Sequence, residues 1–346
     1  MLGETSIRAM PDTIQLAPSL RTAQMPLTQI PIIDVSPLRG APGKAEMVEQ
    51  ISRACREIGF FYAVNHGVKE EMIARVYAEA KRFFALPEAE KEKVAIEHSS
   101  CHRGWFRMGG ENLAPAKQAQ GDLKEGYKVG RDLPLDHPRV LAGVPLHGPN
   151  QWPDFLPGWR EVMQGYYDEM VELGRKMIGA FALALGLDED FFAPWLGITM
   201  TTLGPLHYPP QKGRVTEAQL GAGAHTDYGC LTLLHQDMSG GLQVRRRDGV
   251  WIDAPPVPGS FVVNIGDMME RWTNGVFQSN QHRVINLSGR ERYSLPFFFD
   301  PDFYAPVECL PTCLRPGETP KYKPTTAGQH LLDMINASFC YHREKA

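Results

Sequence analysis

The 346-residue sequence lacks an apolar run long enough to span a bilayer, and no charged leader precedes an apolar segment. It also lacks a basic excess, because the net charge is −4, so neither a nucleic-acid partner nor a membrane partner is predicted. A phosphate-binding loop, a dinucleotide fingerprint and a serine-nucleophile elbow are absent as well. The sequence shows no obligate protein partner, which leaves a small molecule as the expected partner.

Cysteine is scarce and is not arranged for zinc. Of the six cysteines, Cys309 and Cys313 form the one closely spaced pair, whereas zinc sites need two such pairs or added histidines. Cys55 and Cys230 stand in apolar stretches and are expected to be buried as small hydrophobic side chains. We therefore expect a soluble protein of a reducing compartment, most simply the cytoplasm.

The composition is that of a globular protein, with 43% hydrophobic and 22% charged residues. The length allows one large domain or two ordinary ones. We divide the chain into a flexible N-terminal arm, an N-terminal region, and a core region that opens on a long helix, with the boundaries 1–28, 29–153 and 154–346. A basic run at 245–247 is followed at once by Asp248 and Gly249, which is typical of a solvated hairpin tip.

The first half of the sequence predicts two strand–helix units followed by irregular structure. Apolar runs indicate strands at 30–38 and 59–68, and helical spacing of apolar residues predicts helices at 43–57 and 69–86. Pro87 ends the second helix. The segment 97–153 is rich in Gly, Pro and polar residues and is expected to form loops with short strands.

The second half changes from a helical to a strand pattern. A long helix is predicted at 157–187, and a final helix at 326–341. Between them stand short apolar runs separated by turn residues, at 200–208, 220–236, 241–252, 260–265, 276–286 and 292–299. Regular short strands of this kind indicate an antiparallel sandwich or barrel. The predicted fold class is α+β with a mainly β core.

Three residues indicate a metal site. His225 and Asp227 stand two apart in GAHTDYGCLTLL, so a strand would aim both side chains to one face, and His282 lies in a separate strand-like run, SNQHRVIN. Two imidazoles and one carboxylate can hold a divalent iron on one face and leave the opposite positions open. The alternative for His225 is a buried histidine with satisfied hydrogen bonds.

A second His-x-Asp pair, His235 and Asp237, has the same strand parity. Glycines flank the earlier pair, at 221, 223 and 229, which suits a strand end where the backbone must leave room for a ligand. The later pair runs straight into the turn at 239–241. We therefore interpret His235 as a structural histidine near a turn.

Arg292 and Ser294 stand two apart in RYSLPFF, shortly after His282. Strand alternation would aim both side chains the same way. An arginine fork beside a hydroxyl can clamp a carboxylate by charge-assisted hydrogen bonds. Together with the three possible metal ligands, this pair indicates an open-faced iron beside an anchored organic acid.

In its order of landmarks, the sequence resembles the isopenicillin N synthase-like iron and 2-oxoglutarate dioxygenases over roughly residues 28–342. The landmarks are DVSPL, GFFYAVNHGV, HYPP, GAHTDYGCLTLL, GGLQV, GVWIDAPPVPGSFVVNIGDMMERWTNG, QHRVIN and RYSLPFFFDPD. The resemblance implies a distorted double-stranded β-helix, or jelly roll, of the cupin type. Helices would flank it, including a long spine helix, and the N-terminal region would share in building the substrate pocket.

The resemblance also implies roles for individual residues. It places the catalytic metal ligands on His225, Asp227 and His282, and the clamp for the distal carboxylate of 2-oxoglutarate on Arg292 and Ser294. A further co-substrate residue falls on Tyr208, for which a core tyrosine is the alternative. Two positions upstream, where many relatives carry an asparagine that faces the co-substrate, this sequence has Leu206 and so lacks that polar contact.

The implied cofactors are Fe(II), 2-oxoglutarate and dioxygen, with ascorbate as a supporting component. The implied reaction decarboxylates 2-oxoglutarate to succinate and CO₂ and oxidises a C–H bond of a small organic molecule, most simply by hydroxylation. Regional analogy suggests four substrate contacts, at Arg103, Trp105, Tyr127 and Phe298. For Trp105 and Phe298 the alternative is an ordinary core aromatic, and for Arg103 it is a surface ion pair.

Two other functions are compatible with the same residues. The first is an iron oxidase of this fold that does not use 2-oxoglutarate, as in isopenicillin N synthase and the plant ethylene-forming oxidase. The second is a non-catalytic small-molecule-binding protein, although such a protein has no chemical need for all five residues. Desaturation or ring formation stays open within the main interpretation, because the product depends on substrate geometry.

Overall fold

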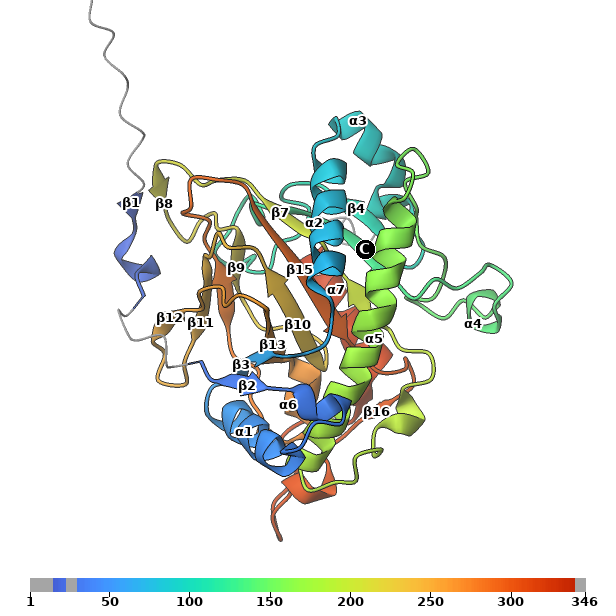
Figure 1. Ribbon diagram of the computed structural model, residues 1–346, viewed down its shortest axis with the longest axis vertical. Helices are drawn as coiled ribbons and strands as arrows, with labels where there is room; N and C mark the ends of the chain where they lie inside the picture. Colours follow the sequence, from blue (N-terminus) through green and yellow to red (C-terminus); the bar gives the residue numbers. More distant parts are fainter. Residues whose placement is uncertain (1–14, 23–29, 340–346) are drawn as a thin grey trace, which may run out of the picture.

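The computed structural model describes residues 15–22 and 30–339. Two main β-sheets, two small strand pairs and a layer of helices make up this part of the chain (Figure 1). The larger sheet has nine strands. From edge to edge these are β2 (Ile32–Asp34), β3 (Phe60–Val64), β13 (Ser260–Ile265), β10 (Leu231–Gln236), β15 (Arg292–Phe299), β6 (Thr202–Leu203), β5 (Glu125–Gly130) and β4 (Gly104–Phe106), while β7 (Leu206–Tyr208) pairs with both β15 and β5.

The smaller sheet has four strands, in the order β12 (Trp251–Asp253), β11 (Leu242–Arg245), β14 (His282–Val284) and β9 (Ala222–His225). Its inner face packs on the larger sheet, because side chains from both sheets form one buried cluster. Members of that cluster are Phe60, Tyr62, Tyr208, Ala222, Leu242, Val244, Ile252, Val262 and Val284. Alternating residues of each strand thus line the space between the sheets.

Three helices cover the other face of the larger sheet (Figure 1). They are α1 (Lys44–Glu57), α2 (Glu70–Phe84) and α5 (Trp159–Ala184), and their apolar stripes share the main core with strands β3, β10 and β15. The remaining helices are α3 (Glu88–Lys91), α4 (Pro138–Leu141), α6 (Asp267–Trp272) and α7 (Ala327–Ser338). Two small strand pairs complete the fold: β1 (Gln15–Leu16) with β8 (Arg214–Val215), and β16 (Pro306–Val307) with β17 (Thr325–Thr326).

Strand β15 shows how the sequence divides between the two layers. Its odd-numbered residues Leu295, Phe297 and Phe299 belong to the main core under the helices. Its even-numbered residues Arg292, Ser294, Pro296 and Phe298 line a cavity between the sheets. The period of two residues along a strand therefore separates a packing face from a face that can carry function.

The predicted fold class is confirmed, and so is the long helix before the β core. The strands predicted between 200 and 299 pair antiparallel with one another, whereas the two parallel pairs, β2 with β3 and β1 with β8, involve strands of the N-terminal segments. Helix α6 was not predicted, since six residues between two strands are too few to show a helical period. The boundaries 28/29 and 153/154 stay predictions.

The N-terminal arm predicted at 1–28 is described over residues 15–22 alone, and residues 1–14 and 23–28 lie outside the described residues. The described stretch is packed against the smaller sheet. Leu20 is buried beside Val215 and Ile285, and the Arg283 guanidinium donates to the Leu20 carbonyl at 3.1 Å. The β1–β8 strand pair, a buried apolar side chain and a buried cation thus attach a segment whose composition shows no periodicity.

In the part of the chain that the structure describes, none of the helices combines the length and the apolar character that crossing a bilayer requires. The basic run at 245–247 sits at the tip of the β11–β12 hairpin, as predicted. Gly249 has φ 84° there, and Arg246 pairs with Asp248 at 2.6 Å. The run is therefore a turn that carries its own counter-charge.

Two glycines of α5 give a matched test of the packing between α5 and β15. A Cβ built on Gly174 would lie 2.2 Å from the Phe299 ring, whereas one on Gly165 would meet nothing within 4 Å. Gly174→Ala should lower the free energy of unfolding by about 1–3 kcal/mol through overpacking. Gly165→Ala should raise it by up to about 1 kcal/mol, because alanine favours the helix. Urea unfolding of both variants measures the difference, and equal effects would contradict this close approach.

Candidate functional site

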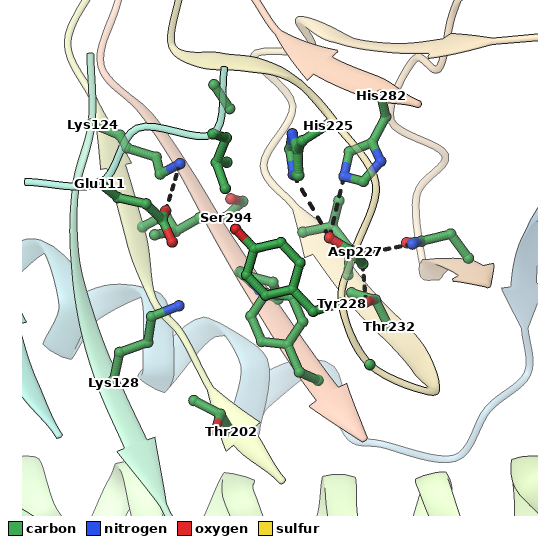
Figure 2. Close-up of a pocket in the computed structure, with 18 of the residues that line it drawn as sticks. Glu111, Lys124, Lys128, Thr202, His225, Asp227, Tyr228, Thr232, His282 and Ser294 are labelled. Carbon is green, nitrogen blue, oxygen red and sulfur yellow. Dashed lines mark hydrogen bonds and ion pairs between the residues drawn. The ribbon is translucent and has the colours of Figure 1, made fainter. Parts of the chain in front are cut away.

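His225, Asp227 and His282 converge on one point between the sheets (Figure 2). His225 ends β9, Asp227 follows two residues later, and His282 begins β14 directly opposite His225 in the antiparallel pair. One potential ligand atom from each residue lies within 4.8 Å of the other two. Residues far apart in the sequence are thus brought together by strand pairing.

The histidine rings present one nitrogen each to this point. His225 Nδ1 lies 2.7 Å from the Gly223 carbonyl, which can only accept, so Nδ1 carries the proton and Nε2 is left as a donor atom for a metal. His225 Nε2 and His282 Nε2 lie 3.7 and 3.5 Å from Asp227 Oδ1. A cation bound among these atoms would be surrounded by two imidazole nitrogens and one carboxylate oxygen.

The second carboxylate oxygen of Asp227, Oδ2, is fixed by hydrogen bonds from two neighbouring strands of the larger sheet. Oδ2 accepts hydrogen bonds from Thr232 Oγ1 and Asn264 Nδ2, both at 2.6 Å. Thr232 on β10 and Asn264 on β13 are direct cross-strand partners, so one register sets both contacts. Such bonds orient a ligating carboxylate and leave Oδ1 to face the opening.

The electrostatics suit a metal. Burial, followed by the neighbouring His282, lowers the pKa of His225 to about 3, so its imidazole is neutral at physiological pH. Burial opposes ionisation of Asp227, yet the two histidines and the hydrogen bonds from Asn264 and Thr232 bring its pKa below the ordinary value. Neutral imidazoles and an ionised carboxylate are the protonation states that bind a divalent cation. The donor set therefore fits iron.

A cationic anchor lies on the inner face of β15. Arg292 Nε donates to the Gly240 carbonyl at 2.7 Å and Nη1 reaches Ser294 Oγ at 3.4 Å, but the buried Nη2 has no partner among the described residues. The guanidinium lies 4.6 Å from the centre of the Tyr208 ring, its cross-strand neighbour. An unsatisfied buried guanidinium nitrogen is costly, and a carboxylate would satisfy it.

These residues share one cavity of about 140 Å³. Its wall combines the polar groups already named with apolar side chains from both sheets and from α7. The apolar members include Phe60, Leu113, Met200, Leu206, Leu234, Leu242, Phe298, Leu331, Ile335 and Phe339. Leu206 lines the cavity at the position where many relatives carry an asparagine, so the polar contact of that asparagine is absent here, as the sequence predicts. The space is mostly apolar with a few converging polar groups, as small-molecule sites are.

The four suggested substrate contacts divide into two pairs. Arg103 and Phe298 line the cavity, whereas Trp105 and Tyr127 do not. Trp105 and Tyr127 are cross-strand partners of β4 and β5 in the main core. Their polar atoms are satisfied there, because Trp105 Nε1 donates to Glu125 at 2.8 Å and the Tyr127 hydroxyl donates to the Gln151 carbonyl. We do not carry these two residues into the proposals below.

Arg103 differs from the surface ion pair that was its alternative. The side chain is buried, and its guanidinium donates to the carbonyls of Cys101, His102 and Leu146 at 2.9, 3.2 and 3.0 Å. Three backbone contacts hold the group in place and leave Nε unpaired among the described residues. Arg103 is therefore a fixed part of the cavity wall.

The sequence interpretation missed three charged residues of the cavity, Glu111, Lys124 and Lys128 (Figure 2). Lys128 directly follows Tyr127 on β5, so strand alternation puts the two side chains on opposite faces. The pairing of Tyr127 with Trp105 in the core implies that Lys128 faces inward. Strand parity could thus have identified Lys128, but Glu111 and Lys124 lie outside regular strands and give no such signal.

The competing His-x-Asp pair has a structural role. His235 faces the helix layer, where its Nδ1 lies 2.9 Å from the Tyr77 hydroxyl of α2. Asp237 accepts from the backbone nitrogens of Tyr293 and Ser239 at 2.7 and 2.9 Å and so fixes the turn. Neither residue belongs to the metal-ligating group found among the described residues.

Comparison with known families matches two regions of the chain. Residues 30–155 match the family described as non-haem dioxygenase in morphine synthesis N-terminal, and residues 202–301 match the 2OG-Fe(II) oxygenase superfamily. The second match contains all of the residues from Tyr208 to Ser294 discussed above. The resemblance to the isopenicillin N synthase-like dioxygenases is confirmed.

The chain is also similar to individual proteins along nearly the whole length of both sequences. The chain is 41% identical to the 2-oxoglutarate-Fe(II) type oxidoreductase hxnY of Emericella nidulans, over 90% of each chain. It is 37% identical to a homoarginine-6-hydroxylase of Glycine max, over 90% of this chain and 98% of that protein. A crystal structure of a Neurospora crassa protein with alpha-KG and thymine has a TM-score of 0.76 at 30% identity, over 89% of this chain and 96% of that one. The chain belongs to the 2OG-Fe(II) oxygenase superfamily and is a 2-oxoglutarate-Fe(II) oxidoreductase.

Proposed function

We propose that this oxygenase hydroxylates a C–H bond of a small organic molecule and converts 2-oxoglutarate to succinate and CO₂. In this proposal His225, Asp227 and His282 hold Fe(II), and Arg292 with Ser294 binds the distal carboxylate of 2-oxoglutarate beside the Tyr208 ring. The observation that carries it is a single cavity that contains three converging donor atoms and a guanidinium whose buried nitrogen has no partner among the described residues.

The protein's own residues have defined tasks in this chemistry. Bound iron would supply the activation of dioxygen, which is the step that side chains cannot perform. Thr232 and Asn264 orient the Asp227 carboxylate, and the Gly223 carbonyl fixes the His225 tautomer. Arg292 and Ser294 set the direction in which 2-oxoglutarate enters. The apolar wall excludes water and positions one C–H bond of the substrate.

The relatives support a small-molecule substrate without naming it. Homoarginine is in the name of the Glycine max relative, thymine is bound in the Neurospora crassa structure, and a JOX2 structure contains 2OG, Fe and JA. These ligands differ in shape and charge, so the identity of the substrate has to come from this chain's own cavity. The five described cysteines are free, which supports the cytoplasm as the compartment.

Asp227 provides a direct test of the iron site, and His235 is a matched control. Asp227→Ala should abolish succinate formation from 2-oxoglutarate and remove iron binding while the far-UV circular dichroism stays unchanged, because the carboxylate is the one anionic ligand. His235→Gln alters the other His-x-Asp pair and should keep iron binding at some cost in stability. Anaerobic titration with Fe(II), followed by metal analysis after gel filtration, measures both. Retention of stoichiometric iron by Asp227→Ala would refute the assigned ligand set.

Arg292 tests the co-substrate anchor. Arg292→Lys replaces a planar fork with a point charge and should raise the Kd for 2-oxoglutarate by about 10- to 100-fold, since charge-assisted bonds contribute about 1.5–3 kcal/mol. Arg290→Lys alters an exposed arginine of the same segment and should leave the Kd unchanged. Titration of each variant with 2-oxoglutarate under anaerobic conditions, followed by the visible charge-transfer band of Fe(II) and 2-oxoglutarate, gives the Kd of each variant. An unchanged Kd for Arg292→Lys would place the anchor elsewhere.

The product identifies the type of oxidation. Hydroxylation adds one oxygen atom to the substrate for each succinate formed, whereas desaturation or ring formation adds none. Mass spectrometry of reactions run under labelled dioxygen distinguishes these outcomes once a substrate is in hand. A product that gains no labelled oxygen would overturn the hydroxylase assignment and leave the oxygenase family intact.

A further inference from the structure

Lys128 extends into the cavity from β5, on the side away from the three metal-ligating residues (Figure 2). Its side chain is buried, yet the structure gives its Nζ no hydrogen bond and no ion pair within residues 15–22 and 30–339. Its close neighbours are the rings of Phe298, Phe106 and Phe339, whose centres lie 5.1, 5.6 and 5.9 Å from Nζ. Among the described residues, the ammonium thus meets aromatic faces and the open cavity. No carboxylate in this part of the chain pairs with it, because the nearby Glu111 is paired with Lys124 and acts on Lys128 only through its field.

The other two buried lysines of the described chain are neutralised. Lys91 pairs with Glu125 at 2.7 Å. Lys124 lies between two carboxylates, with Asp122 at 2.6 Å and Glu111 at 2.8 Å. Within this part of the chain, the fold therefore supplies a carboxylate to each buried lysine except the one whose ammonium faces the cavity.

An unpaired buried ammonium costs free energy, since removal from water is not offset by a counter-charge. Burial accordingly lowers the pKa of Lys128, and the field of Glu111 offsets that effect in part. Contacts with three aromatic rings compensate further by cation–π attraction. A ligand that brings a negative charge to Nζ would remove the remaining cost, so the structure is prepared for an anion at this position.

This anion is separate from 2-oxoglutarate. The distal carboxylate of 2-oxoglutarate is assigned to Arg292 and Ser294 on β15, whereas Lys128 lies on β5 and contacts neither residue. The Lys128 ammonium lies over the ring of Phe298, which is four residues beyond Ser294 on the inner face of β15. The molecule that meets Lys128 is therefore the one to be oxidised.

We propose that the Lys128 ammonium binds a carboxylate of the prime substrate, which makes that substrate a monocarboxylic acid with an apolar or aromatic body. The inference rests on the proposed function, because it names the substrate class of the same site. The body of the acid would pack against Phe298, Leu206, Met200 and Ile335, all of which line the cavity.

Glu111 limits the substrate to one negative charge. Burial opposes its ionisation, but Lys124 and then Lys128 lower the pKa of Glu111 to about 2, so it is anionic in the cavity wall. A second carboxylate on the substrate would share the cavity with this charge and be repelled by it, because the cavity is a medium of low dielectric constant. A diacid is thus disfavoured relative to a monoacid.

The test compares three probes that share one body and differ in charge. They are 3-phenylpropanoate, 3-phenylpropanamide and 3-phenylpropylamine, added to protein loaded anaerobically with Fe(II) and 2-oxoglutarate and followed by isothermal titration calorimetry. The acid should bind at least about tenfold more tightly than the amide, as one charge-assisted hydrogen bond provides. The amine should bind most weakly.

Two variants connect the preference to Lys128. Lys128→Met keeps an unbranched side chain only one atom shorter, removes the charge and should abolish the preference for the acid over the amide. Lys128→Arg should retain it. The Kd for 2-oxoglutarate, measured by the visible band, should be the same in both variants and in the unaltered protein, because the co-substrate uses Arg292. Circular dichroism confirms that each variant is folded.

Several results would overturn the proposal: equal binding of acid and amide, tighter binding of the amine, no measurable binding of the acid, or an acid preference that survives Lys128→Met. The visible band is measured in the same samples and reports the proposed function independently. Loss of the band with intact acid preference would count against the iron and 2-oxoglutarate assignment. A normal band without acid preference would count against Lys128 alone.

Discussion

The register of the paired strands is the constraint that creates the site. Each important pair of side chains stands on directly opposed residues of neighbouring strands: His225 with His282, Thr232 with Asn264, and Arg292 with Tyr208. A slip of one residue in any strand would turn its inward side chains toward the opposite face. In the larger sheet, the packing of the outward residues under α1, α2 and α5 fixes the register of the second and third pairs, so the helix layer supports the site without touching it.

Some charged side chains in the cavity have partners of opposite charge among the described residues, and others do not. Asp227 lies beside two histidine rings and accepts two hydrogen bonds, and these contacts hold its pKa below the ordinary value although the carboxylate is buried. Lys124 receives two carboxylates, while Arg292 and Lys128 receive none from the described residues. The protein thus leaves positive charge unsatisfied where anionic ligands would bind and satisfies it elsewhere. Binding free energy can then come from groups that are already desolvated and positioned.

Much of this arrangement could be predicted from the sequence, because periodicity and motif order are local signals. The long helix, the short strands, the iron-ligating triad and the Arg292–Ser294 pair all depend on spacing within short segments. Which residues of the N-terminal region face the cavity could not be predicted in the same way. Trp105 and Tyr127 have the composition of substrate contacts, but cross-strand pairing buries them together in the core. Lys128 is the neighbour that faces inward, and its importance depends on the absence of a carboxylate among the described residues, which only three-dimensional packing reveals.

Successive side chains of β14 point to opposite faces of the smaller sheet, and one of them contacts the described N-terminal stretch 15–22. His282 points inward as a ligand, while Arg283 points outward, stacks on Trp251 at 4.0 Å and donates to the backbone carbonyls of Ser19 and Leu20. Backbone carbonyls are the same for every amino acid. Apart from the buried Leu20 and from Thr22, whose hydroxyl donates to Asp253, this early stretch can therefore drift in sequence over evolution and still brace the strand that carries His282. A shortened stretch would leave the buried guanidinium with the Gln243 side chain as its one acceptor among the described residues.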